Sequence, residues 1–156
     1  MDETLGRHVN ARFERLAQRV RDELAAAGLP VVAPGLDRGL AAGAEVRVSA
    51  WNQHFGEDPE VVVSWHVSPR LRGRAVADVQ RDHGVTPAIR RSGEVQEAMA
   101  AAVIAILSLA GYTARDRGSE YSPFDVLVLA GPERGAAPVW SDRAEGPGRT
   151  EGEPAK

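Results

Sequence analysis

Two apolar runs, separated by an acidic turn, constrain the fold of this chain most strongly. In the run EVRVSAW, residues 45–51, and in the run EVVVSWHV, residues 60–67, apolar side chains occupy every second position. Such alternation is typical of strands with one buried face. The connecting residues NQHFGEDP contain Gly56 and the turn-forming sequence EDP. The sequence therefore predicts an antiparallel β-hairpin.

The apolar faces of these two strands also predict how they pair. Pairing Trp51 with Glu60 places both apolar sets on one side of the sheet, whereas a slip by one residue would separate them. The predicted pairs are Val48–Val63 and Val46–Trp65 on the apolar face, and Arg47–Ser64 and Glu45–His66 on the polar face. The polar face, which carries Trp51 and Val62, is expected to face solvent.

Three segments are predicted to be helices. The segment 3–28 repeats apolar residues at spacings of three and four and ends at Gly28, before Pro30. A shorter helix is expected over about 71–83, ended by Gly84 and Pro87. A third is expected over about 92–110, with Ser92 as its N-cap. Its apolar residues are broad enough to predict burial on more than one side.

Short β-branched runs complete the predicted fold. LPVV, residues 29–32, is a possible strand, and YTARDRG and FDVLVLAG are expected to form two closing strands. The order indicates an α+β fold, with an antiparallel or mixed sheet of about four or five strands and two long helices packed on one face. Residues 1–131 would form a single domain. Residues 132–156 have too little apolar content to fold alone and are predicted to be a disordered tail, although Trp140 lies within it. The two long helices end alike, so an internal duplication stays open.

Composition excludes several classes of chemistry. The chain of 156 residues has no cysteine, which excludes disulfides, thiolate nucleophiles and cysteine-ligated metals. Its first residues do not resemble a secretory signal, so we expect a cytoplasmic protein. The uncharged stretch 98–114 is short for a membrane span and rich in alanine. We therefore expect it to be a core helix, and we expect no membrane association.

The hairpin carries the only candidate catalytic or metal-binding group that we identify. His54, Glu57 and Asp58 share its loop, and His66 ends its second strand. Imidazole and carboxylate groups are those that a metal or a general base would use, but no known ligand spacing is present. A solvated turn with an exposed cross-strand pair of Glu45 and His66 is the explanation that we favour. The sequence thus leaves an enzyme open while favouring a non-catalytic protein with no cofactor and no metal.

Arginines predict a binding surface. The span from Arg70 to Arg91 contains six arginines and two aspartates, a local charge of 6 − 2 = +4 within a chain of net charge −3. We therefore expect a small adaptor that binds a protein partner through the hairpin face and the arginine-rich segment. The residues expected to bind are Arg47, Trp51, Arg70, Arg72 and Arg74.

Three further possibilities stay open for these surfaces. Nucleic-acid binding by Arg70 to Arg91 is a weaker alternative, because Arg90 breaks the apolar pattern of a helix-turn-helix. Coverage of the Trp51 face by the tail, through Val139 or Trp140, is an alternative to an open binding face, and nothing in the sequence ranks the two. The helix over 3–28 has a stripe that would also suit a homodimer.

Overall fold

The computed structural model describes residues 3–50, 56–82, 84–133 and 137–141, with the backbone alone considered for 3–7. Within these ranges lie three helices, α1 (Glu3–Ala26), α2 (Pro69–Gln80) and α3 (Pro87–Leu109). Four strands are present in the same ranges, β1 (Gly43–Ser49), β2 (Glu60–His66), β3 (Thr113–Asp116) and β4 (Val126–Ala130). The predicted α+β class is confirmed.

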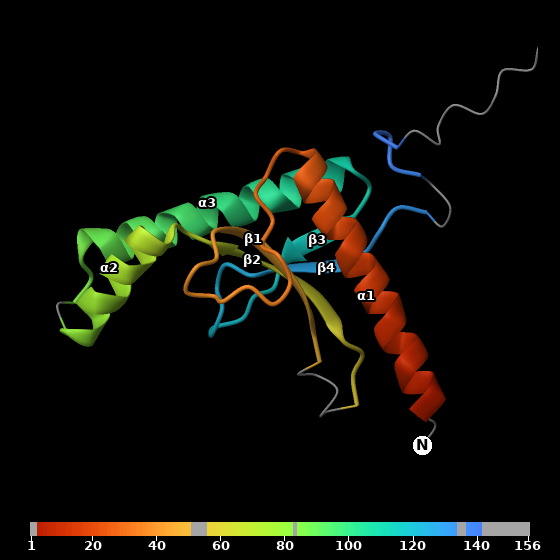
Figure 1. Cartoon of the computed structure of the whole chain (residues 1–156), viewed down its shortest axis with the longest axis horizontal. Coiled ribbons are helices and arrows are strands. Elements are labelled where there is room, and N and C mark those ends of the chain that lie inside the picture. The colour runs from red at the N-terminus through yellow and green to blue at the C-terminus, as the bar shows by residue number, and fades with distance from the viewer. Residues whose placement is uncertain (1–2, 51–55, 83, 134–136, 142–156) are drawn as a thin grey trace, which may run out of the picture.

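The strands form one antiparallel sheet in the order β1-β2-β4-β3. One face of this sheet packs against helices: α1 contacts β1 and β2, and α3 contacts β2, β4 and β3 (Figure 1). Helix α2 contacts α3 and lies beside its first part. The end of the molecule that α2 and the start of α3 form projects beyond the sheet. The first turns of α1 project beyond the sheet on another side. Two helical elements therefore extend past the core.

A single hydrophobic core lies between the sheet and the two helices. Residues spaced by three and four on α1 fill one side of it, as the amphipathic pattern predicts. The fully buried members of the core are Ala17, Val20 and Leu24 of α1, Val103 and Leu107 of α3, and Ala44, Val61, Val126 and Val128 of the sheet.

The hairpin forms with its predicted faces, but its register differs from the prediction by two residues. Val46 lies opposite Val63, and the last pair is Ser49 with Glu60. A shift of two residues keeps every side chain on its face, so the alternation of apolar residues cannot distinguish the two registers. The two predicted polar contacts, Arg47 with Ser64 and Glu45 with His66, still form. In the observed register these residues are diagonal neighbours rather than direct partners.

Helix α3 begins earlier than predicted. Thr86 is its N-cap, accepting a hydrogen bond from the Ile89 amide at 3.4 Å, and Pro87 is its first residue. Proline is favourable in a first turn because that amide has no helical partner, so here it starts a helix rather than ending one. Ser92, the predicted cap, lies within the helix and accepts a hydrogen bond from Gln96 Nε2 at 3.2 Å.

Two other expectations about local structure are wrong. The segment 29–32 forms no strand, because only Val31 makes a bridge, to Ala44. Helix α3 is not buried on several sides: Leu109 is 90% exposed, whereas Val103 and Leu107 are buried. Among the described helices, α3 is the one long and apolar enough to cross a membrane by length and composition, which is weak evidence since core helices share these properties.

Candidate functional site

The second face of the sheet is closed by a network of charged side chains around Asp125. The Asp125 carboxylate accepts hydrogen bonds from Ser64 Oγ at 2.5 Å and Arg47 Nη2 at 3.0 Å, and Arg117 Nη1 lies 3.5 Å away. Arg117 also pairs with Glu60 at 3.1 Å. These side chains come from β1, from β2, from Arg117 just after β3 and from Asp125 just before β4, so the network links all four strands.

The centre of this face is apolar and covered. Val62 lies opposite Leu127 in the register, and both side chains are buried. The expectation of an open, solvated face is therefore wrong at Val62, which is fully buried although Glu60 and Ser64, two residues to either side, take part in the charged network. Arg47, predicted to bind a partner, makes its hydrogen bonds within the protein. Trp51, predicted on the same face, lies outside the described residues.

A second polar group lies at the other end of the hairpin. His66 Nε2 and Glu45 Oε2 are 2.7 Å apart, and Arg38 lies 3.5 Å from the other Glu45 oxygen. Partial burial raises the pKa of Glu45, but the hydrogen bond with His66 and the charges of Arg38, His66 and Arg47 outweigh it and lower this pKa below 4.5. The expected pair of Glu45 with His66 is thus present.

The candidate catalytic residues do not converge in the part of the chain that the structure describes. Glu57 and Asp58 are exposed before β2, whereas His66 ends the strand, roughly 20 Å away at 3.3 Å per residue. Within the described ranges, no group of three or more histidine, aspartate or glutamate side chains is arranged to hold a metal ion. His54 lies outside the described residues.

The arginine-rich segment divides into internal and free side chains. Arg72 donates hydrogen bonds to the carbonyl oxygens of Gly39 at 2.7 Å and Ala41 at 3.0 Å, which holds the loop before β1 against α2. Arg74 pairs at 3.2 Å with Asp78, a buried carboxylate that also accepts a hydrogen bond from Thr86 Oγ1.

The remaining arginines point away from such contacts. The side chains of Arg70, Arg81 and Arg90 are exposed and make no hydrogen bond or ion pair with any described residue. Of the predicted binding residues in this segment, Arg70 is therefore free, Arg74 is partly exposed in an ion pair, and Arg72 has a structural contact.

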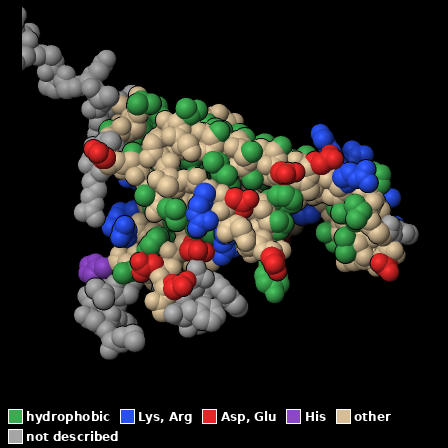
Figure 2. Space-filling view, turned by 180° about the vertical axis from the view of Figure 1, so that it is seen from behind, with side chains coloured by type: hydrophobic (Ala, Val, Ile, Leu, Met, Phe, Trp, Pro, Cys, Tyr) green, Lys and Arg blue, Asp and Glu red, His purple; other side chains and the backbone are tan. Residues whose placement is uncertain are grey.

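An apolar groove lies between α2 and α3; Arg72 lines it, but Arg70, Arg81 and Arg90 do not. It has a volume of about 520 Å³ and is lined mainly by Ala75, Val76, Val79, Ile89 and Gly93. Val76 is 48% and Val79 63% exposed, so two large apolar side chains face solvent one helical turn apart. Figure 2 shows hydrophobic and arginine side chains together at the end of the molecule that α2 and the start of α3 form. We call this end of the molecule, residues 69–97, the helical arm.

Known proteins offer no guide to this groove. Neither protein-family models, nor curated proteins, nor solved structures match the chain. Its chemistry must therefore be inferred from its own residues. The arginines of this segment were predicted to bind, but Val76 and Val79 were not, although their spacing of three in AVADV indicates an apolar stripe on that helix.

Proposed function

We propose that this protein is a non-catalytic protein-binding module, and that the helical arm binds an acidic amphipathic helix of a protein partner. The observation that carries the proposal is an exposed apolar groove on an element that projects from the core and that also carries arginines without internal partners. Exposed apolar patches with polar rims are typical of protein interaction sites.

The shape of the groove favours a helix as the bound element. Two packed helices leave a channel between them, and an apolar helix face can enter such a channel with anchor residues at spacings of three and four. Val76 and Val79 supply one wall, and Ile89 supplies the other. Binding would remove these side chains from water, which supplies the driving force.

The free arginines of the helical arm favour an acidic partner. Arg70, Arg81 and Arg90 lie in this arm, although they do not line its groove, and none has a carboxylate partner among the described residues. Each can pair with an aspartate or glutamate of a partner that extends past the groove. A phosphate backbone would use these arginines but would leave Val76 and Val79 exposed to water. A protein segment satisfies both kinds of side chain, which is why we prefer it to nucleic acid.

A designed peptide pair tests the proposal. One labelled helical peptide carries leucines at spacings of three and four with glutamates elsewhere, and its match replaces the glutamates by lysines. Fluorescence anisotropy should show binding of the acidic peptide and at least about tenfold weaker binding of the basic one. Equal binding of both peptides, or of neither, would contradict the proposal.

Two substitutions of exposed apolar residues locate the binding site. Val79→Asp places a charge in the groove, whereas Leu109→Asp makes the same kind of change at the far end of α3, where the side chain is 90% exposed. We expect Val79→Asp alone to abolish binding of the acidic peptide. Equal loss in both variants would place the site elsewhere. Because both side chains are exposed, neither change should alter the melting temperature by more than a few degrees.

A further inference from the structure

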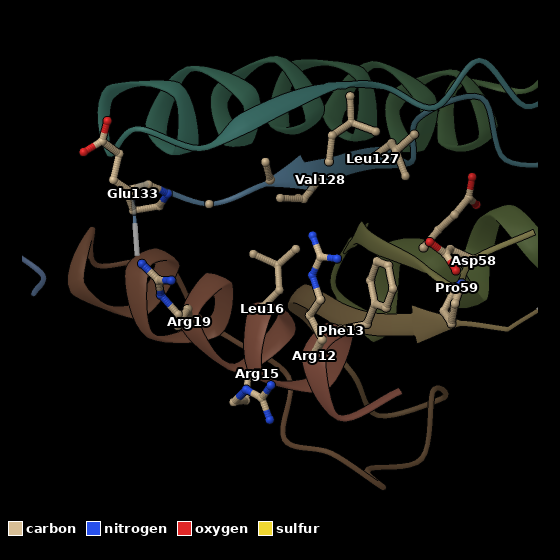
Figure 3. A pocket seen from close by; sticks show the side chains of 15 residues that line it. Arg12, Phe13, Arg15, Leu16, Arg19, Asp58, Pro59, Leu127, Val128 and Glu133 are labelled. Carbon is tan, nitrogen blue, oxygen red and sulfur yellow. The ribbon is translucent and has the colours of Figure 1, made fainter. Parts of the chain in front are cut away.

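A second groove lies where α1 leaves the sheet. It has a volume of about 930 Å³ and lies between the middle of α1, residues 12–19, and the strand β4, with residues 58–60 at the end away from Glu133 (Figure 3). Leu16 lies close to Gly131 at its inner end: a Cβ on that glycine would be 3.3 Å from Leu16 Cδ1. Towards the helix N-terminus the same space is open, and Phe13 borders it.

The apolar stripe of α1 is longer than the surface that covers it. Val20 and Leu24 are fully buried, whereas Val9, Phe13 and Leu16 continue the same stripe and are only partly buried. A helix stripe that continues past its own core leaves apolar surface for another chain to cover.

The two walls of this groove carry opposite charges. Arg12 and Arg15 lie on the α1 wall, and Asp58 and Glu133 lie on the wall that the sheet and its flanking residues form (Figure 3). All four side chains are exposed, and none makes an ion pair with any residue that the structure describes, although Arg12 lies over the ring of Phe13 at 5.8 Å. Two further charged residues of the groove are already engaged, since Glu60 pairs with Arg117 and Arg19 lies over the ring of Tyr112.

We infer that the chain forms a two-fold symmetric homodimer in which the N-terminal half of α1 of each copy occupies the groove of the other. In a two-fold interface the same surface meets itself, so a surface that pairs with itself must contain both members of each complementary pair. This groove does. The two α1 helices would lie antiparallel between the two sheets, and Arg12 and Arg15 of each copy would meet Asp58 and Glu133 of the other.

This arrangement explains both the charges and the stripe. A bound helix would cover Phe13 and Leu16 and place basic and acidic walls in contact. The helical arm, by contrast, carries six arginines against four acidic residues, a local charge of 6 − 4 = +2, so two arms would repel each other. The groove beside α1 is therefore the self-complementary surface, and it is separate from the surface assigned above to a different protein.

Charge reversal tests the dimer with the full chain. Sedimentation velocity at low salt, up to about 0.1 mM protein, should show the wild type associating into dimers. The double variant Arg12→Glu with Arg15→Glu should raise the dissociation constant at least about tenfold, because attractive pairs become repulsive at both symmetric contacts. The double variant Asp58→Arg with Glu133→Arg should do the same.

Mixing the two variants gives the decisive result. In a one-to-one mixture every reversed residue faces an oppositely charged one, so a heterodimer should form although neither variant dimerises alone. The charge-matched control, Arg81→Glu with Arg90→Glu on the helical arm, should dimerise as the wild type does. Circular dichroism and melting temperature should be unchanged in all variants, because every substituted side chain is exposed.

Three results would overturn the inference. These are a wild type that stays monomeric over this concentration range, a dimer that survives both reversals, and a mixture that fails to restore association. None of them bears on the helical arm, because its peptide-binding test does not depend on the oligomeric state.

Discussion

Replacing Asp125 by asparagine would remove the charge on which the second face of the sheet depends. The amide has nearly the same shape as the carboxylate and can still accept the hydrogen bond from Ser64 through its oxygen. Arg47 and Arg117, however, would lose the anion that lies 3.0 Å and 3.5 Å from their nitrogens. The substitution therefore isolates the contribution of one negative charge.

The magnitude follows from how much solvent the charges retain. The Asp125 side chain is 9% exposed, and those of Arg47 and Arg117 are 29% and 18% exposed. Removing one partner of a fully buried pair costs about 3–5 kcal/mol. Here water reaches part of both guanidinium groups, and Arg117 keeps Glu60 as a partner. We therefore expect a loss of about 2–3 kcal/mol in the free energy of unfolding.

Urea unfolding measures this loss. With a denaturant dependence of about 1–3 kcal/mol per molar, the midpoint should fall by on the order of 1 M at an unchanged slope. The control is Glu94→Gln, which removes an exposed pair with Arg91 at 3.7 Å and should change stability by less than about 0.5 kcal/mol. If Asp125→Asn moves the midpoint no further than this control, the network is not what closes this face.

Three other perturbations test neighbouring parts of the structure. The pKa of Glu45 is lowered in the folded state, so its interactions with His66 and Arg38 stabilise the fold above pH 4.5. This stabilisation is lost as the pH falls through the folded-state pKa of Glu45. The difference in unfolding midpoint between wild type and Glu45→Gln should accordingly shrink in acid, and a constant difference would refute this. Gly43→Ala should cost at least about 3 kcal/mol in urea unfolding, since its φ is +104° and the new Cβ would lie 2.3 Å from a carbonyl oxygen. Gly35→Ala, at φ +81° with open space, should cost about 1–2 kcal/mol, and equal costs would argue against the clash. Arg72→Ala should speed amide exchange in the loop 37–41, measured by mass spectrometry, because the guanidinium holds that loop. Unchanged exchange would show that the loop is held by other contacts.

Local sequence patterns predicted the helices, the hairpin and the buried faces of this fold, but not the register of the hairpin or the residue at which α3 begins. Alternation of apolar residues assigned Val46 and Val63 to the core correctly, yet it could not tell a register from one shifted by two, because both keep the same faces. Pro87 is predicted to end the helix over 71–83 because proline interrupts helices. Proline is equally suited to the first turn of a helix, and Pro87 is the first residue of α3. Thr86 immediately before it was the signal that decides between the two.

The candidate sites depend on tertiary geometry that no local pattern contains. The arginines between Arg70 and Arg91 were visible as a cluster, but which of them are free depends on where the loop before β1 meets α2. Val62 was expected in solvent because its neighbours on that face are polar. It is fully buried, and the polar residues on either side of it, Glu60 and Ser64, bond to arginines that Asp125, distant in sequence, also holds.

The sheet order has a consequence for how the chain folds. Strands β1 and β2 pair within one stretch of sequence, as do β3 and β4, but the central pairing of β2 with β4 joins only residues 61–63 to residues 126–128. Bringing β2 and β4 together closes the loop between residues 63 and 126, which is the pairing with the largest cost in chain entropy. Only three residue pairs of the sheet offset this cost. We expect the helical hairpin of α2 and α3 to form first and draw these strands together. Substitutions that weaken its turn should then slow refolding far more than they speed unfolding.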